Sequence, residues 1–375
     1  MIPRSLFTPE QEALRLDVRN YLLGEVVPEY PSWAVEGRPS TGFWKGMAAL
    51  GVLGIGVPEE YGGLAGSDFR HSVVVTEEIQ RLGLAIGGLR VHTDICVPYL
   101  VHHASAEQKT EWLPRMCAGD VVVALALSEP GAGSDLKAMA TRAERQGDVY
   151  VVNGAKTFIS NGASADLVIL AVKTDPAAGR NGISLLLVDT STPGFSRGRR
   201  LDKLGLKAQD LSELSFTDME VPVGNLLGQE NRGFEYLTSN LAHERLSIAV
   251  NSQAAAAAAL AWTVEELTGT APGQDAKFTL ANCATEVAAG QALIDLAITQ
   301  HIRGDLDVAD AALAKLFCTE LQGRVVDRCL GLHDPGTAFT NDSRIGHAYL
   351  DGRVSRIYAG SSEIMKVIVS QHLGL

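Results

Sequence analysis

Hydrophobic residues change their spacing twice along the chain. From Thr8 to about position 120 they recur at three- and four-residue intervals, as in TPEQEALRLDVRNYLL, which opens with an N-cap signal. From Val121, short runs rich in Val, Ile, Leu and Phe, such as VVVALALS and ADLVILAVKTD, are separated by Gly, Asn, Asp and Pro. After Gly233 the helical spacing returns in longer segments, over about 234–267, 279–303 and 308–332, and again from about Ser361.

These three regions predict an α+β multi-domain chain. We expect an N-terminal α-helical bundle at 1–120, a middle β domain at 121–228 and a C-terminal α-helical bundle at 229–375. The β runs follow one another without helical segments between them, which favours an antiparallel β-barrel or sandwich over a parallel sheet. The Ala-rich tract at 254–259 predicts close helix–helix contact, because Ala is a strong helix former with little bulk.

Composition narrows the class of protein. The chain has 375 residues, 46% of them hydrophobic, which is enough for a substantial core. A net charge of -12 without a clustered basic face argues against a nucleic-acid partner. There is no run of about 18 apolar residues and no signal-like N-terminus, so we expect no membrane span and a cytoplasmic location. The five cysteines are scattered without a CxxC pair, which predicts reduced thiols and no metal site.

The sharpest local motif is LSEPGAGSD, from Leu127 to Asp135, where a strand runs into a Gly-rich turn. Backbone N–H groups and hydroxyls in such a turn can hold an anion or the polar edge of a ring. A nicotinamide-binding fingerprint fits less well, because the third Gly is absent, Pro130 interrupts, and no βαβ pattern follows. A plain strand–loop connection is the alternative reading of this motif.

Three ordered motifs carry a family resemblance. LSEPGAGSD, then GAKTFISNGASAD from Gly154, then YAGSSEIMKVIV from Tyr358 resemble the motifs of acyl-CoA dehydrogenases, and the likeness spans nearly the whole chain. The resemblance implies a helix–barrel–helix subunit that oligomerises through its C-terminal helices. It also implies an FAD between these helices and the β domain, and dehydrogenation of an acyl-CoA at its α and β carbons to the trans-2-enoyl thioester.

The resemblance implies a place for several side chains around the flavin. Leu127 and Ser128 would lie along its pyrimidine side, where negative charge develops. Phe158 stands where the family usually has a Trp packed on the flavin, although core packing alone would also account for it. Ser160 stands where a Thr hydroxyl usually meets flavin N5, and Ser134 would lie towards the coenzyme A arm of the substrate.

The catalytic base is the most informative position, because the family places its carboxylate at either of two points in the sequence. One is the C-terminal YxG motif, where this chain has Ala359, which cannot accept a proton. The other is on the long helix after the β domain, where LAHERLSIA places Glu244. The resemblance therefore implies that Glu244 removes the α proton, while the backbone N–H of Ala359 and a ribityl hydroxyl of FAD polarise the thioester carbonyl. A solvated helix face is the usual position for a Glu beside an Arg, but apolar neighbours such as Leu246 favour burial.

Four further positions complete the predicted site. Arg245 and Gly360 are expected at the substrate, although a structural ion pair is an equal reading for Arg245. Ser361 and Gly336 are expected at the cofactor. The family's Arg and Gln that reach the FAD pyrophosphate and adenosine across a subunit interface are missing from EELTGTAPGQD and CLGLHDPGTAF, where Leu332 or a neighbour replaces the Gln and Gly336 remains.

These departures leave the assembly and the partners open. Either a paralogous subunit supplies the missing residues in a hetero-oligomer, or a homo-oligomer, dimer or tetramer, has a rebuilt FAD site. The substrate is an acyl-CoA or a carrier-protein thioester of unspecified chain length, and an electron-transferring flavoprotein is the expected electron acceptor. A flavin oxidase or monooxygenase of the same superfamily, and a non-catalytic partner subunit, are the competing interpretations.

Overall fold

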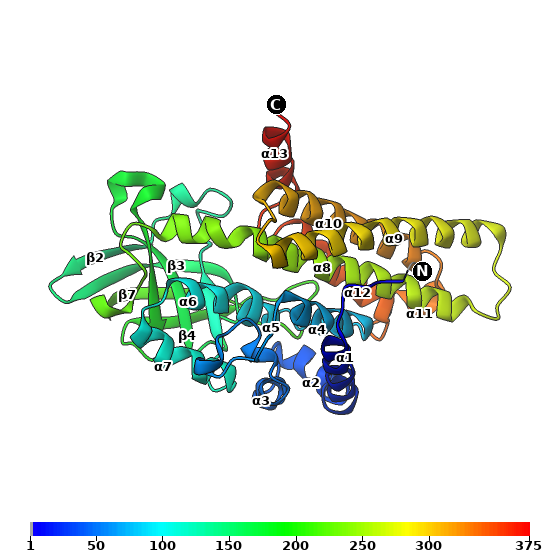
Figure 1. Ribbon diagram of the computed structural model, residues 1–375, viewed down its shortest axis with the longest axis horizontal. Helices are drawn as coiled ribbons and strands as arrows, with labels where there is room; N and C mark the ends of the chain where they lie inside the picture. The colour runs from blue at the N-terminus through cyan, green and yellow to red at the C-terminus, as the bar shows by residue number, and fades with distance from the viewer. Residues whose placement is uncertain (1–2) are drawn as a thin grey trace.

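The computed structural model describes residues 3–375, and its N-terminal part is helical (Figure 1). The Ser105 hydroxyl accepts from the backbone N–H of Gln108, whose side chain accepts in return from the Ser105 N–H, so this pair caps the last helix of the region. The helices are α1 (Pro9–Tyr21), α2 (Val27–Glu36), α3 (Thr41–Ala49), α4 (Phe69–Arg81), α5 (Gly88–Arg90), α6 (Val97–His103) and α7 (Ala106–Cys117), with π-helical segments at Leu22–Val26 and Val91–Cys96 and short 3₁₀ turns at Val52–Gly54 and Glu59–Tyr61.

The middle part is one eight-stranded sheet with the order β6-β7-β3-β2-β4-β5-β8, and β1 pairs with β4. The predicted middle β domain is confirmed, and most neighbouring strands are antiparallel. The pairings of β1 with β4 and of β2 with β4 are parallel. The strands are β1 (Val123–Ala126), β2 (Arg142–Gln146), β3 (Val149–Ser160), β4 (Leu167–Lys173), β5 (Ile183–Asp189), β6 (Phe195–Arg200), β7 (Leu211–Pro222) and β8 (Leu226–Leu227).

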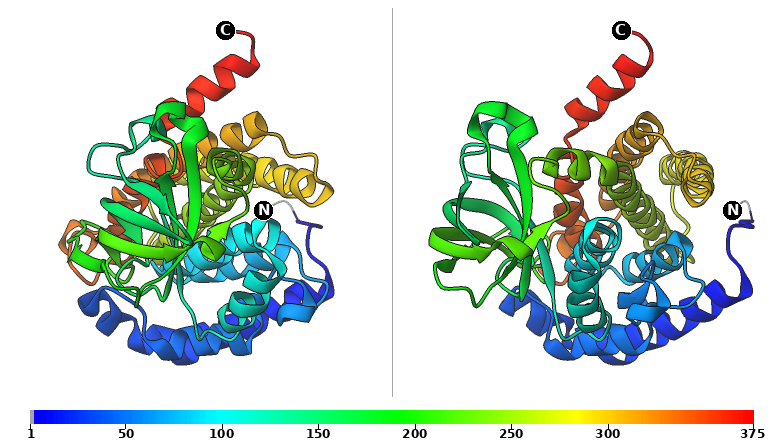
Figure 2. Two further views of the ribbon diagram at one scale, coloured as in Figure 1. Left: turned by 90° about the vertical axis from the view of Figure 1, so that its left-hand side faces the viewer. Right: turned by 60° about the vertical axis from the view of Figure 1, so that its left-hand side comes forward.

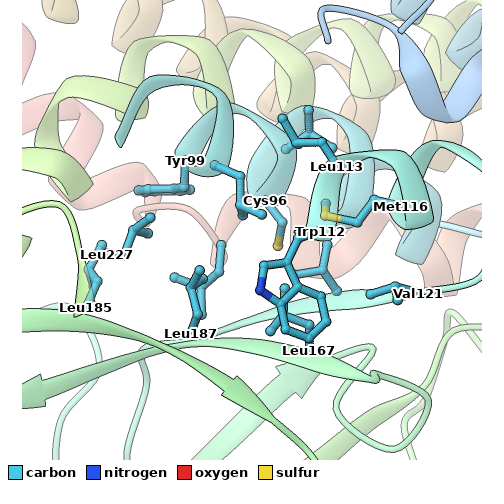
Figure 3. Packing of buried hydrophobic residues seen from close by; sticks show 14 of the residues in the cluster. Cys96, Tyr99, Trp112, Leu113, Met116, Val121, Leu167, Leu185, Leu187 and Leu227 are labelled. Atoms are coloured by element: carbon cyan, nitrogen blue, oxygen red, sulfur yellow. The ribbon is translucent and has the colours of Figure 1, made fainter. Parts of the chain in front are cut away.

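One face of this sheet packs against the N-terminal helices. Figure 3 shows Trp112 of α7 pointing towards Leu167 and Leu187 of the sheet, and Leu113 and Met116 of the same helix belong to the same cluster. All five side chains are buried, so removing apolar surface from water stabilises the contact. Tyr99 of α6 belongs to the same cluster and is fixed there by its neighbours.

A close backbone contact fixes α5 against the end of β3. The Asn161 side-chain amide donates to the carbonyls of Gly88 and Val123, at 2.9 and 3.2 Å. A Cβ on residue 88 would lie only 2.3 Å from Asn161 Oδ1, so a glycine is needed for this approach. The contact holds the start of the α5–α6 segment beside Ser160, the last residue of β3.

The C-terminal part is helical again, as predicted, and the predicted helix from 279 begins earlier, at Gln274. Helix α8 runs from the β domain through the centre of the molecule, and α13 projects from the body (Figures 1 and 2). Four residues of the Ala tract, Ala255, Ala256, Ala258 and Ala259, are buried against neighbouring helices. The helices are α8 (Gly233–Leu267), α9 (Gln274–Arg303), α10 (Val308–Leu330), α11 (Pro335–Ala338), α12 (Arg344–Gly352) and α13 (Ser362–His372), with a 3₁₀ turn at Arg353–Arg356.

Two general features concern the described residues as a whole. Over residues 3–375, no helix is both long enough and apolar enough to cross a membrane. The cysteines Cys96, Cys117, Cys283, Cys318 and Cys329 are all buried and not disulfide-bonded.

Candidate active site

Glu244 lies on α8 and is 6% exposed. The Tyr99 hydroxyl donates to its Oε1 at 2.9 Å, and the Asn240 side-chain amide donates to the same oxygen at 3.1 Å. Asn240 precedes Glu244 by one helical turn, whereas Tyr99 comes from α6, a segment 145 residues away in the sequence. The carboxylate is therefore oriented by side chains from two helices, α6 and α8.

This environment changes the acidity of the carboxyl group. Burial raises the pKa of Glu244 to about 7, against the lowering effect of the hydrogen bonds from Tyr99 and Asn240 and of the charge of Arg245. A carboxylate with this pKa is half ionised near neutral pH, and it is a stronger base than an exposed Glu. Such a group can both accept a proton from a carbon acid and release it again at physiological pH.

Arg245 follows on the same helix and is 4% exposed. Its Nε and Nη1 have no hydrogen-bond partner within residues 3–375, and no ion pair in that range joins it to Glu244. Leaving buried N–H groups unpaired is costly, so the Nε and Nη1 groups, unpaired within residues 3–375, are available to an acceptor from outside the chain. Among the residues that the structure describes, the ion pair considered for Arg245 is not formed.

The C-terminal motif forms a strained loop between the 3₁₀ turn and α13. Ala359 has φ 50°, a left-handed conformation that Ala rarely adopts, and Gly360 follows with φ 92°. The Lys315 ammonium, from α10, donates to the carbonyl of Tyr358 at 2.8 Å and also to the carbonyl of Gly360. Ser361 caps α13 by accepting from a backbone N–H of its first turn at 3.4 Å.

The β-domain side of the site is built around LSEPGAGSD. The Lys156 ammonium donates to the Leu127 carbonyl at 3.1 Å and to Glu129 Oε1 at 2.8 Å. Ser128 accepts from the Thr157 N–H at 2.9 Å through its carbonyl oxygen. Burial alone would raise the pKa of Glu129, but the charge and hydrogen bond of Lys156 and two backbone N–H donors hold it below its ordinary value. These contacts fix the backbone of both predicted flavin neighbours.

A bulge in β3 turns one aromatic side chain outwards. The pairing of β3 with β7 shifts register between Lys156 and Ile159, and Phe158, inside this shift, has φ 59° and is 64% exposed. Ser160 then accepts from the Gln209 side-chain amide at 3.0 Å. An exposed aromatic face, a hydroxyl and the fixed 127–128 backbone on one domain are the groups that a flat, polar-edged ring such as a flavin requires. The residues present therefore fit FAD.

A small cavity joins the two halves of the site. It has a volume of 40 Å³, and Gln209, the partner of Ser160, lines it together with Asn251 of α8 and Tyr358 of the C-terminal loop. A larger cavity of 470 Å³ is lined by Tyr99 and Asn240, the two partners of Glu244. The structure thus brings the β3 end, the middle of α8 and the 358–360 loop together.

Two predicted residues lie apart from this centre. Ser134 is exposed on the turn between β1 and β2, where a long substrate arm could reach it. Gly336 lies in α11, at the end of the molecule remote from the β domain (Figure 1), and its N–H donates to Asp334 at 2.7 Å. Gly336 does not join the other site residues within one subunit.

The sequence did not assign a role to several residues that build the site. Asn240 could have been found from its position four residues before Glu244. Lys315 carried a signal too, since it is a lone Lys in the apolar stretch AALAKLFC. Tyr99 and Gln209 carried none, because their partners are distant in sequence. Over residues 3–375, no group of three or more His, Cys, Asp or Glu is arranged to hold a metal ion.

Comparisons with known proteins cover the whole architecture. Models of the N-terminal, middle and C-terminal domains of acyl-CoA dehydrogenase match residues 8–120, 124–219 and 231–374. The mitochondrial long-chain specific acyl-CoA dehydrogenase of Rattus norvegicus is 36% identical over 383 residues, covering 99% of this chain and 88% of the relative. The crystal structure of an acyl-CoA dehydrogenase from Geobacillus kaustophilus matches with 40% identity and a TM-score of 0.96 over 100% of both chains. A glutaryl-CoA dehydrogenase from Mycobacterium smegmatis in complex with FADH2 matches with 26% identity and a TM-score of 0.89 over 98% of this chain and 95% of that one.

Proposed function

The chain belongs to the acyl-CoA dehydrogenase family and catalyses the FAD-dependent α,β-dehydrogenation of an acyl-CoA, and on this premise we propose that Glu244 is its catalytic base. The observation that carries the proposal is the burial of Glu244, which raises its pKa to about 7, in a chain whose C-terminal motif has Ala359 in place of an acid. Oxidase, monooxygenase and non-catalytic roles are not favoured, because the relatives at 36% and 40% identity that span the chain are dehydrogenases.

The chain's own groups divide the proton chemistry between them. Glu244 accepts the proton as the α C–H bond breaks, and the electron pair moves towards the thioester carbonyl. The Ala359 N–H donates to the carbonyl oxygen, where negative charge collects. Arg245 adds positive potential on the same helix, since its buried guanidinium keeps free N–H groups. A bound FAD would supply the acceptor for the β hydrogen, which leaves as hydride and so completes the double bond.

Several positions would hold the cofactor and the substrate arm. Phe158 offers an exposed ring as a wall for the flavin, and Ser160 offers a hydroxyl at the end of the same strand. Backbone N–H groups at Leu127 and Ser128 would face the pyrimidine side, supported by the contacts of their own carbonyls. Ser134, on its exposed turn, would meet the coenzyme A arm.

The assembly is part of the proposal. Helix α13 projects from the body (Figure 2), with Val367 49% exposed on it and Leu373, just after its end, 69% exposed. Such apolar surface indicates contact with another subunit. Gly336 is remote from the other FAD residues of its own chain, which fits a role at the cofactor of a neighbouring subunit. We propose a homo-oligomer that passes its electrons to an electron-transferring flavoprotein; the cytoplasmic location expected from the sequence stays a prediction.

Titration with FAD tests the assembly. Tight stoichiometric binding by the purified chain alone would support the homo-oligomer. A chain that binds FAD only after a paralogous subunit is added would support the hetero-oligomer instead. One FAD-binding curve therefore distinguishes a hetero-oligomer from a homo-oligomer with a rebuilt FAD site.

Anaerobic reduction tests the reaction and the base together. Straight-chain and branched acyl-CoAs are mixed with the FAD-loaded protein, and loss of the visible band of oxidised flavin is followed for wild type, Glu244→Gln and the control Glu265→Gln. Glu265 is an exposed residue of the same helix. We expect bleaching by wild type and the control and a rate at least about 10²–10⁴-fold lower in Glu244→Gln. Equal bleaching by Glu244→Gln would contradict the assignment.

A further inference from the structure

Lys315 is a fully buried lysine without a carboxylate partner. It lies on α10 with 0% exposure, and no ion pair joins it to an acidic group of residues 3–375. Its ammonium donates to the carbonyl oxygens of Tyr358 and Gly360, the residues on either side of Ala359. A buried ammonium satisfied by carbonyls alone is costly in free energy, which calls for a function beyond packing.

The position of the first carbonyl gives that function. The Tyr358 C=O and the Ala359 N–H belong to the same peptide group, whose C–N bond has partial double-bond character. A cation that donates to the oxygen draws electron density away from the nitrogen, so the N–H becomes a stronger donor. Lys315 thus acts on the N–H that faces the thioester oxygen, through the peptide itself.

The second carbonyl fixes the direction of that N–H. Ala359 is held at φ 50° and Gly360 at φ 92°, conformations that need support from their surroundings. Because Lys315 donates to the carbonyls before and after Ala359, it clamps both ends of the strained segment. Arg245 also lies close enough for its charge to act on Lys315, so two cations raise the positive potential behind the loop.

We propose that Lys315 is a positioning residue, which aims the Ala359 N–H at the thioester oxygen and strengthens it as a donor when the α proton leaves. The inference rests on the proposed role of Ala359 in acyl-CoA dehydrogenation. Lys315 does not touch the substrate; it acts through one peptide group. A lysine that only anchors the loop would leave the polarisation of the substrate unchanged once the loop is folded.

The test compares two neutral variants with wild type. Lys315→Gln keeps an amide that can donate to both carbonyls but has no charge, and Lys315→Met keeps the length without a donor. Each FAD-loaded protein binds the trans-2-enoyl-CoA product of its best substrate, labelled with ¹³C at the carbonyl carbon, and the isotope-edited infrared stretch of that carbonyl is recorded. Flavin reduction by the saturated acyl-CoA gives kcat and KM.

We expect the ligand carbonyl stretch to move to higher frequency in Lys315→Gln and further in Lys315→Met, because the bond is less polarised. We also expect kcat to fall on the order of tenfold with little change in KM, less than the roughly 10²–10³-fold loss when an oxyanion donor is removed outright. A carbonyl stretch identical to wild type in Lys315→Gln would overturn the proposal. Failure of both neutral variants to fold and bind FAD would overturn it as well, because Lys315 would then serve the fold.

One outcome separates this inference from the function on which it rests. If wild type binds the enoyl-CoA without any shift of its carbonyl stretch from the value in water, Ala359 is not the donor and the proposed oxyanion site itself fails. If wild type shows the shift and the variants keep it, the oxyanion site stands and only the role of Lys315 is wrong.

Discussion

The two halves of the active site contain the same two residue types, one buried Lys and one buried Glu, in opposite arrangements. In the β domain, Lys156 and Glu129 form an ion pair at 2.8 Å. In the other half, and within residues 3–375, Lys315 donates only to carbonyls, and Glu244 accepts only from the neutral groups of Tyr99 and Asn240. The pKa values follow the arrangement, because pairing holds that of Glu129 below its ordinary value, whereas burial raises that of Glu244 to about 7.

The paired arrangement of Glu129 suits a structural role, whereas the unpaired arrangement of Glu244 suits proton transfer. A paired carboxylate is a poor base, and Glu129 uses its oxygens to hold Lys156 and two backbone N–H groups of the flavin-side loop. An unpaired buried carboxylate is unstable as an anion, so it accepts a proton readily. Arg245, which follows Glu244 on α8 and forms no ion pair with it within residues 3–375, leaves positive potential for the charge that forms on the substrate. Breaking the pair should therefore affect folding, and changing the separated groups should affect catalysis.

Breaking the pair should have the largest effect on stability. Glu129→Gln leaves the Lys156 ammonium buried without its counter-charge, and we expect the free energy of unfolding to fall by about 3–5 kcal/mol. Denaturant unfolding of the FAD-free chain measures the change. Adding Lys156→Met to Glu129→Gln should recover part of the loss. A double variant whose loss of unfolding free energy equals the sum of the losses in Glu129→Gln and Lys156→Met would show that the two residues are not coupled.

The half of the site that contains Glu244 should instead give the rate of flavin reduction a pH dependence near neutrality. Burial raises the pKa of Glu244 to about 7, and as the proposed base Glu244 can act only when it is deprotonated. The rate constant for flavin reduction at low substrate should therefore rise about tenfold per pH unit up to that value and level off above it. A stopped-flow series across this range, with the exposed-residue variant Glu265→Gln as the control, measures the profile. A profile that stays flat down to the ordinary pKa of a Glu would contradict the raised value.

Removing the charge of Arg245 should lower the rate of flavin reduction without destabilising the fold. Arg245→Met takes away a guanidinium whose Nε and Nη1 have no partner, so we expect the free energy of unfolding to stay unchanged or to rise. We expect flavin reduction to slow roughly tenfold, about 1.4 kcal/mol in the barrier, because positive potential near the thioester is lost. Arg232→Met, before the start of α8, is the control. A large loss of stability in Arg245→Met would indicate a structural role.

The smallest effect should come from a neutral partner of the base. The Tyr99 hydroxyl lowers the pKa of Glu244 by donating to its carboxylate. Tyr99→Phe keeps the aromatic packing, so we expect the acid limb of the pH profile to move to higher pH and the rate well above it to change only a few-fold. The same pH series measures the shift, and a limb that moves to lower pH would contradict the hydrogen-bonding role of Tyr99.

The sequence predicted the features that depend on local pattern. The change of hydrophobic spacing at Val121 and Gly233 predicted the helix–sheet–helix order, because the spacing reflects which face of each element is buried. Apolar neighbours on one helix predicted that Glu244 is buried. The parallel pairing of β1 with β4, the Tyr99 hydrogen bond and the contact of Lys315 with the C-terminal loop could not be predicted, since each joins segments whose approach is decided by tertiary packing.

The measurement that tests the central claim most directly isolates the proton step. A 3-thia-acyl-CoA has sulfur at the β position and cannot lose a hydride from it, so proton abstraction is the only reaction open to it. We predict that wild type and Glu265→Gln exchange the α hydrogens of this ligand for solvent deuterium and that Glu244→Gln, loaded with FAD and bound to the same ligand, does not. Exchange by Glu244→Gln at the wild-type rate would show that another group removes the proton.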